Sequence, residues 1–125
     1  MRLADLVNAI GGRIISGDDC PDLEIDRAFA ADLLSDVLAL TDEKTTLVTG
    51  MINPQVMRVA EILSITAVIF VRGKIPPPVL VSYAKELDIP LVTTEKTMFE
   101  TCGVMYENGV RACRTRSMDD AQRSA

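Results

Sequence analysis

Residues 45–74, TTLVTGMINPQVMRVAEILSITAVIFVRGK, predict a strand, a helix and a second strand in direct succession. Thr46–Thr49 is a β-prone run that ends at Gly50, and residues 66–71 are apolar almost throughout, as in a strand covered on both faces. Between them Asn53 is a candidate helix N-cap, followed by a proline that suits the first turn. Because parallel strands end at the same edge of a sheet, this unit predicts a binding edge where its two strands end.

Hydrophobic periodicity and turn residues predict the elements on either side of this unit. Strands are expected at Arg13–Ser16, Arg27–Ala30 and residues 89–92. Helices are expected ahead of Gly11, over residues 33–40 with Asp32 as cap, after the prolines at 76–78, and after Thr94 as cap. The inward positions of the last helix are expected to be Met98, Phe99, Cys102 and Met105. This alternation favours an α/β fold with a small, mostly parallel sheet flanked by helices.

The chain of 125 residues predicts one domain. Regular patterning continues to about residue 110, so residues 1–110 are expected to form the folded domain. Residues 111–125 hold four arginines, two aspartates and small polar residues without periodicity. We expect them to form a polar C-terminal tail outside the core.

Composition and charge exclude some classes of partner. A net charge of −5 predicts no binding to nucleic acid or to acidic membranes, because phosphate contacts need clustered Lys and Arg. The first residues lack an apolar signal-peptide core, and the longest apolar stretch, residues 62–71, is too short to span a bilayer. The three cysteines lie too far apart for a CxxC pair. These features predict a cytoplasmic protein with reduced thiols.

The sequence lacks the usual catalytic machinery. It contains no histidine, which removes the commonest general base and every Ser-His or Cys-His arrangement. A P-loop needs a glycine five residues before Gly-Lys and a hydroxyl residue after it, but the chain has Val68 and Ile75 around Gly73-Lys74. We therefore expect no catalytic residue, no metal site, no cofactor and no enzymatic activity.

Five short segments follow one another in order: GGRIISG (11–17), LVTG (47–50), VRGK (71–74), LDIPLVTT (87–94) and TMFETCG (97–103). In this order they resemble the DRTGG domain, an α/β module found beside CBS domains in some inorganic pyrophosphatases and in phosphotransacetylase-like proteins. The fold is also similar to the N-terminal domain of HPr kinase/phosphorylase. The resemblance implies a regulatory or ligand-binding module, and in the pyrophosphatases this region binds adenine nucleotides.

Two strand ends depart from the pattern of that family. The family has Gly-Asp-Arg after its first parallel strand, where this chain has Gly50-Met51-Ile52. It has Thr-Gly-Gly after the second, where this chain has Val71-Arg72-Gly73. The loss of the acid and the base predicts weak or lost affinity for adenine nucleotides.

The candidate ligand-binding residues follow three strand ends: Gly50, Met51, Asn53, Arg72, Gly73, Lys74, Thr93 and Thr94. Arg72 and Lys74 are a close basic pair that could bind phosphate or carboxylate. Free amides at the starts of the helices would attract the same anion. Each feature has a plainer alternative: Gly50 as a tight turn, the basic pair as solvated loop charges, and Thr94 as a helix cap.

We therefore expect a non-catalytic regulatory or ligand-sensing domain that binds a nucleotide or another anionic small molecule at the carboxyl edge of the sheet. The alternative is a protein-interaction adaptor or oligomerisation module. In that case the same edge or the helix over residues 33–40 would pack on a protein partner or on a second copy. With either function we expect a homo-oligomer, with a homodimer as the first expectation. A concave pocket favours the first function and a flat apolar surface the second.

Overall fold

The computed structural model describes residues 1–113 of the chain. Its elements follow the order α1 (Leu3–Ala9), β1 (Arg13–Ser16), β2 (Arg27–Ala30), α2 (Leu34–Leu40), β3 (Thr46–Thr49), α3 (Gln55–Leu63), β4 (Ala67–Phe70), α4 (Pro78–Leu87), β5 (Leu91–Thr93), α5 (Met98–Glu107) and β6 (Arg111–Ala112). The elements predicted from the sequence are present, and β6 is an addition.

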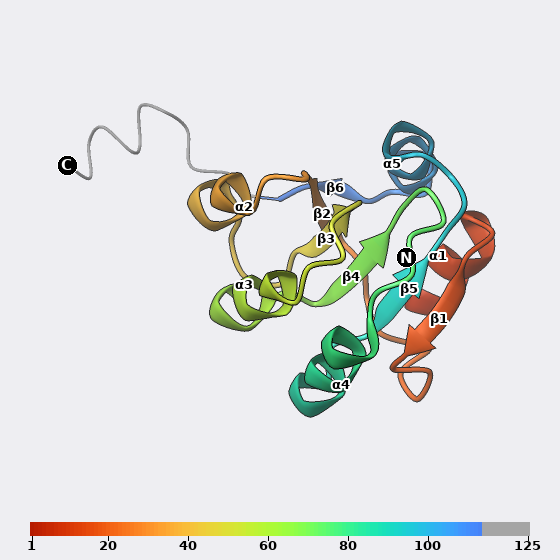
Figure 1. Ribbon diagram of the computed structural model, residues 1–125. Coiled ribbons are helices and arrows are strands. Elements are labelled where there is room, and N and C mark those ends of the chain that lie inside the picture. Colours follow the sequence, from red (N-terminus) through yellow and green to blue (C-terminus); the bar gives the residue numbers. More distant parts are fainter. Residues whose placement is uncertain (114–125) are drawn as a thin grey trace, which may run out of the picture.

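The strands form one sheet in the order β1-β5-β4-β3-β2-β6 (Figure 1). Neighbouring strands from β5 to β6 run parallel, whereas β1 pairs with β5 in the antiparallel direction. The register pairs Thr49 with Phe70, so β3 and β4 end side by side. The predicted fold class, a mostly parallel sheet flanked by helices, is confirmed.

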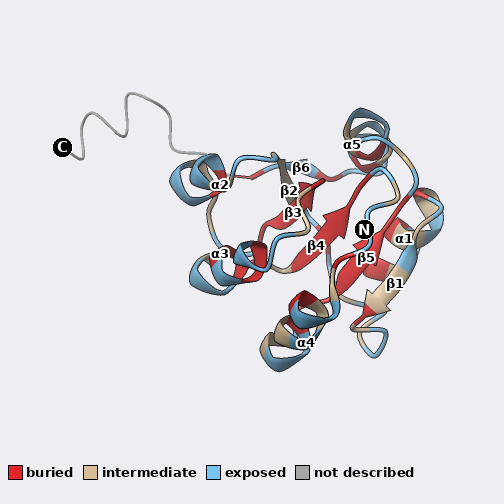
Figure 2. Cartoon of the chain, in the orientation of Figure 1, coloured by how far each residue is buried: buried red, intermediate tan, exposed pale blue. Residues whose placement is uncertain are grey.

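Helices cover both faces of this sheet. The helices α2, α3 and α4 lie on one side, and α1 and α5 lie on the other (Figure 1). The central strands are therefore buried, while the exposed residues lie on the outer surfaces of the helices (Figure 2). Adjacent strand residues serve different layers: Leu47 belongs to the core on the α3 side and Val48 to the core on the α1 side. This two-sided burial explains why β4 is apolar at every position.

The start of α5 differs from the prediction. Thr97, not Thr94, is the N-cap: its hydroxyl accepts from the Glu100 amide at 3.3 Å, and the Glu100 carboxylate accepts from the Thr97 amide at 3.2 Å. This reciprocal capping box satisfies two amides that the helix itself leaves free. The resulting helix phase turns Phe99 outward, 87% exposed, where an inward position was expected. Met105 is buried as predicted.

The folded part continues past residue 110, where the tail was predicted to begin. Arg111–Ala112 form β6 and pair with the first residues of β2. Val110 and Cys113 on either side are buried. A strand of two residues is too short to show alternating apolar and polar positions in the sequence. It pairs with β2 through backbone hydrogen bonds, which any residue type can make. The rest of the predicted tail, residues 114–125, lies outside the described residues. Within residues 1–113, no helix is long and apolar enough to cross a membrane.

Candidate functional site

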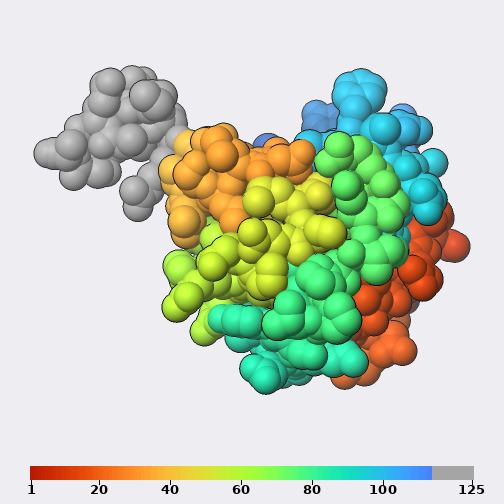
Figure 3. Space-filling view, viewed as in Figure 1, coloured from red at the N-terminus to blue at the C-terminus, as the bar shows by residue number. Residues whose placement is uncertain are grey.

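The carboxyl ends of β2, β3 and β4 meet at one edge of the sheet. The segments that follow these strands, coloured orange, yellow and green, adjoin one another on the face seen in Figure 3. Asp32 follows β2, Gly50 follows β3 and Arg72 follows β4, and the three residues are in direct contact. The sheet order thus gathers two of the predicted ligand residues and one residue that was not predicted.

Asp32 is the residue that sequence reasoning missed. It was expected to cap α2, but Leu33 occupies that position and no side chain caps the helix. Instead, Asp32 Oδ1 accepts a hydrogen bond from the Gly50 amide at 2.7 Å and a longer one from Thr49 Oγ1 at 3.3 Å. The reason is topological, because β2 and β3 are neighbours and Asp32 extends past the end of β2 toward the Gly50 turn. The sequence offered one signal, an acid two residues after a predicted strand.

Arg72 lies across the Gly50 turn. Its backbone is in the left-handed region, with φ of 59°, and its amide donates to Lys96 O at 2.8 Å. A methyl group at Gly50 would overlap Arg72 Nη2, so the glycine leaves room for this guanidinium. The guanidinium also lies 3.9 Å from Asp32 Oδ2, and both side chains are about half exposed, at 52% and 53%. A long ion pair of exposed groups contributes little to stability.

The second glycine of the edge is also covered by a charged side chain. Gly73 has φ of 68°, a conformation that favours glycine, and a Cβ there would lie 2.6 Å from Glu95 Oε2. Its amide donates to Thr94 O at 2.8 Å. Lys74 is exposed, and its amide donates to Val71 O. At this strand end the side chains of Arg72 and Lys74 are exposed.

Several amides at the start of α3 are satisfied within the chain, and they belong to the group that was expected to attract a ligand. The Met51 amide donates to Thr49 Oγ1 at 3.1 Å. Asn53 acts as a cap, because its Oδ1 accepts from the Gln55 amide at 2.9 Å and its carbonyl accepts from the Val56 amide. Met51 itself is half-buried against the core beside α3. The amides of Met51, Gln55 and Val56 are therefore already engaged.

The threonine pair after β5 has a structural function in the present arrangement. Thr93 Oγ1 donates to Lys74 O at 2.8 Å, and Thr94 Oγ1 donates to Ile10 O at 2.7 Å. Both residues are buried, and their hydroxyl protons are already engaged, so they do not offer donors to a ligand. These two hydrogen bonds link the Lys74 turn and the C-terminal end of α1 to the end of β5. A small cavity of about 200 Å³ lies beside them, with Arg13 and Glu95 in its lining.

Metal and thiol chemistry find no support in the described part of the chain. Among residues 1–113, no group of three or more Cys, Asp or Glu side chains is placed to hold a metal ion. Cys20, Cys102 and Cys113 are all free thiols. Burial is the main cause that raises the pKa of each above its ordinary value of 9.0. A raised pKa leaves less of the reactive thiolate at neutral pH.

Comparison with known proteins confirms the fold. No family model matches the chain, and no curated protein matches it. The structure is similar to the CBS and DRTGG domains of the regulatory region of Clostridium perfringens pyrophosphatase, with a TM-score of 0.71 at 13% sequence identity. The match covers 83% of this chain and 45% of the pyrophosphatase chain, so this chain corresponds to less than half of the pyrophosphatase regulatory region. That protein was crystallised with its activator, diadenosine tetraphosphate. At this identity the likeness establishes a DRTGG-like fold, as the sequence predicted.

Proposed function

We propose that this chain is a non-catalytic regulatory domain that senses an anionic small molecule, a nucleotide among the candidates, at the carboxyl edge of its sheet. The observation that carries the proposal is the half-exposed guanidinium of Arg72, held over the Gly50 turn by the end of β4. A guanidinium has five donors, and a single 3.9 Å approach to Asp32 leaves most of them for a ligand. Lys74, exposed two residues later, adds a second positive charge.

The surroundings of Arg72 suit a ligand with both a charged and an apolar part. Met51 and Ile52 follow Gly50 and are half-buried against the core. Their exposed surfaces would contact a ring while Arg72 holds a phosphate or carboxylate. The nucleotide activator of the pyrophosphatase regulatory region supports the same class of ligand for a domain of this fold.

Isothermal calorimetry tests the proposal by titrating AMP, ATP, diadenosine tetraphosphate and inorganic phosphate into the full chain and into Arg72→Ala. Loss of one charge-assisted contact of ~1.5–3 kcal/mol predicts a roughly tenfold or greater loss of affinity in the variant. Lys44→Ala is the matched control, because it removes one positive charge at the amino end of β3. If every titrant binds Arg72→Ala as tightly as wild type, or none binds wild type below millimolar concentrations, the sensing function is wrong at this edge.

Exposed apolar side chains favour a second candidate, an interaction module. Leu33 and Leu38 at α2 are 59% and 45% exposed. The helix α2 lies next to the segment that carries Asp32, so a protein bound there would cover part of the same edge. Analytical ultracentrifugation of wild type, Leu33→Ser/Leu38→Ser and the distant control Phe99→Ser separates the two functions. An oligomer that dissociates only in the double variant supports the interaction module.

A further inference from the structure

An apolar cavity of about 300 Å³ lies between strand β2 and helix α5, beside the short strand β6. The strand β2 contributes Ala28 and Ala30 to its wall, and α5 contributes Cys102 and Met105. None of the residues around Arg72 at the carboxyl edge belongs to this wall. The function proposed for the carboxyl edge therefore makes no use of this cavity.

Two alanines of β2 create the space. Ala28 and Ala30 lie on the side of the strand that faces α5, since both pack with Met105 in the core on that side. Their side chains are single methyl groups, so they do not fill the distance to the helix. Both alanines and Cys102 are half-buried, which leaves part of the wall open to a ligand. An apolar group that enters the cavity would remove this surface from water, which is favourable.

The guanidinium of Arg111 is the one charged group in the described wall, since Glu107, next to Tyr106 on α5, lies outside it. Arg111 Nη1 donates to Tyr106 O at 2.9 Å and to Val110 O at 3.0 Å. The guanidinium carbon also lies 4.2 Å from the centre of the Tyr106 ring, within the range of a cation–π contact. These contacts hold the exposed guanidinium in place, while Nε and Nη2 have no partner among residues 1–113 and can donate to a carboxylate.

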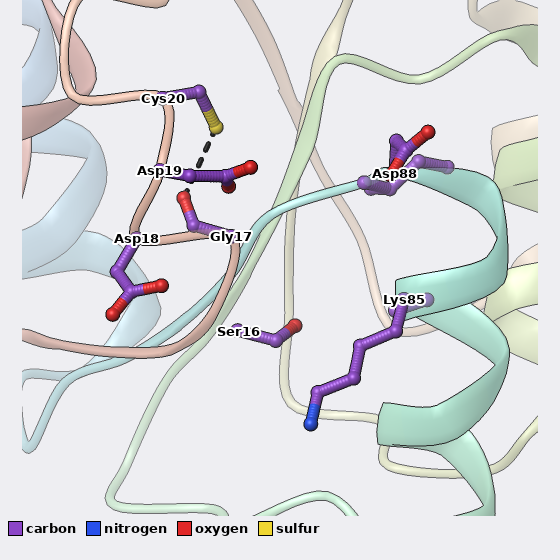
Figure 4. A pocket seen from close by; sticks show the side chains of 9 residues that line it. Ser16, Gly17, Asp18, Asp19, Cys20, Lys85 and Asp88 are labelled. Carbon is purple, nitrogen blue, oxygen red and sulfur yellow. Dashed lines mark hydrogen bonds between the residues drawn. The ribbon is translucent and has the colours of Figure 1, made fainter.

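The described wall of this cavity contains no carboxylate that would repel an anion. Burial raises the pKa of the Cys102 thiol in the wall, and no acidic group adds to that shift. A larger cavity of about 670 Å³, between the turn after β1 and the C-terminal end of α4, is different (Figure 4). Its lining mixes Asp18, Asp19 and Asp88 with Lys85, so its charges do not select one class of ligand. The apolar cavity beside Arg111 does select one, an apolar molecule with a single negative end.

The volume of the apolar cavity limits the size of this ligand. At about 30 Å³ for each non-hydrogen atom, the share of a molecule in liquid water, the cavity has room for about ten such atoms. We propose that it binds a medium-chain monocarboxylate, with the hydrocarbon chain between β2 and α5 and the carboxylate on Arg111. A ligand with more charges would bring a charged group against the apolar wall, at a cost in free energy.

Calorimetry with octanoate, hexanoate and octylamine tests this site in the full chain. Hexanoate is expected to bind about fifteenfold more weakly than octanoate, because each methylene group contributes about fourfold in affinity. Octylamine is expected not to bind, because its charge has the same sign as Arg111. Arg111→Gln is expected to bind octanoate about three- to tenfold more weakly, as for the loss of one partly solvated charge contact. The matched control is Arg58→Ala, which removes an exposed arginine of α3 on the opposite face of the sheet and should leave octanoate binding unchanged.

Two further measurements locate the ligand in the cavity. Ala30→Leu places a larger apolar side chain in the space and is expected to abolish octanoate binding without lowering the melting temperature. In wild type, octanoate is expected to slow the alkylation of Cys102 by N-ethylmaleimide, as measured by peptide mass spectrometry. Cys20, a free thiol outside this cavity, is the internal control and should react at the same rate with and without octanoate. If Ala30→Leu fails to fold, the protection of Cys102 still decides the location.

The proposal is overturned if millimolar octanoate shows no saturable binding, or if Arg111→Gln binds it as tightly as wild type. It is also overturned if Arg72→Ala loses octanoate binding while Arg111→Gln keeps it, because the carboxylate would then bind at the carboxyl edge. A dimer that dissociates in Ala30→Leu, together with the absence of octanoate binding, would assign the cavity to a second copy of the chain instead.

Discussion

At the scale of single residues, the carboxyl edge holds a carboxylate of its own where a ligand anion would bind. Asp32 Oδ1 accepts from the Gly50 amide at 2.7 Å, and its other oxygen lies 3.9 Å from Arg72. Both donor groups are ones that an incoming phosphate would use. An anion bound as proposed would therefore compete with Asp32 for these two donors.

Replacement of Asp32 with asparagine tests this competition. Asn Oδ1 can keep the hydrogen bond to the Gly50 amide, while the negative charge beside Arg72 is lost. The interaction between two half-exposed charges contributes ~0.2–1 kcal/mol. If an anion no longer has to displace Asp32 from Arg72, we expect its affinity to rise by up to about fivefold. Calorimetry with the tightest anion found for wild type measures the change. Weaker binding in Asp32→Asn would mean that Asp32 helps to hold the ligand.

Gly50→Ala tests whether the position of the Arg72 guanidinium matters for anion binding, because the variant displaces this group and keeps its charge. The added methyl would overlap the Arg72 guanidinium, which is the mobile end of a side chain, and Gly50 has no positive φ. We expect the unfolding free energy to change by less than ~1 kcal/mol and anion affinity to fall as in Arg72→Ala. Gly103→Ala is the control, because a methyl at this helical position in α5 meets nothing within 4 Å and should leave binding unchanged. Unaltered anion binding in Gly50→Ala would show that the position of Arg72 over the turn is not needed.

At the scale of elements, helix starts are fixed by local hydrogen bonds. The Thr97 and Glu100 side chains close a capping box and set the phase of α5, and with it the outward position of Phe99. The Asn53 side chain performs a similar function before α3. These contacts involve residues two or three positions apart, and each can be removed without opening the core.

Thr97→Ala is expected to lower stability by ~1 kcal/mol, which for a small domain lowers the melting temperature by a few degrees. The effect should depend on pH, because hydrogen bonds from the Thr97 amide and hydroxyl lower the pKa of Glu100 below its ordinary value of 4.5. A depressed folded pKa contributes stability above the unfolded value, and this contribution is lost as the pH falls through the folded pKa. The difference between wild type and Thr97→Ala should therefore shrink below pH 4.5, as measured by thermal unfolding across acid pH. Thr97→Ala keeps the bond from the residue 97 amide, so a difference that stays constant with pH would exclude a contribution from the hydrogen bond between the Thr97 hydroxyl and the ionised Glu100.

At the scale of the whole molecule, the sheet is completed by residues far from it in sequence. β6 covers the outer edge of β2, and Val110 and Cys113, at 3% and 5% exposure, pack on either side. Unpaired strand edges invite association with other chains. The last described residues therefore protect β2 as well as stabilise it.

Comparison of chains 1–113 and 1–109 tests this contribution. The shorter chain lacks the strand pairing and the burial of Val110, and burial of one valine side chain alone contributes ~1.5 kcal/mol or more. We expect the shorter chain to melt several degrees lower and to self-associate more strongly, as measured by thermal unfolding and light scattering. Equal melting temperatures would mean that residues 110–113 contribute nothing to the stability of the fold.

The sequence by itself determined the elements other than β6, their order and the fold class, because hydrophobic periodicity, caps and turn residues act over a few neighbouring positions. It also placed Gly50 and Arg72 at the ends of parallel strands. Only the tertiary structure decided that Asp32, 18 positions before Gly50, accepts its amide proton, and that Thr94 donates to Ile10 O across 84 positions. Strand order and register create these contacts, and both depend on how distant segments pack on the two faces of the sheet.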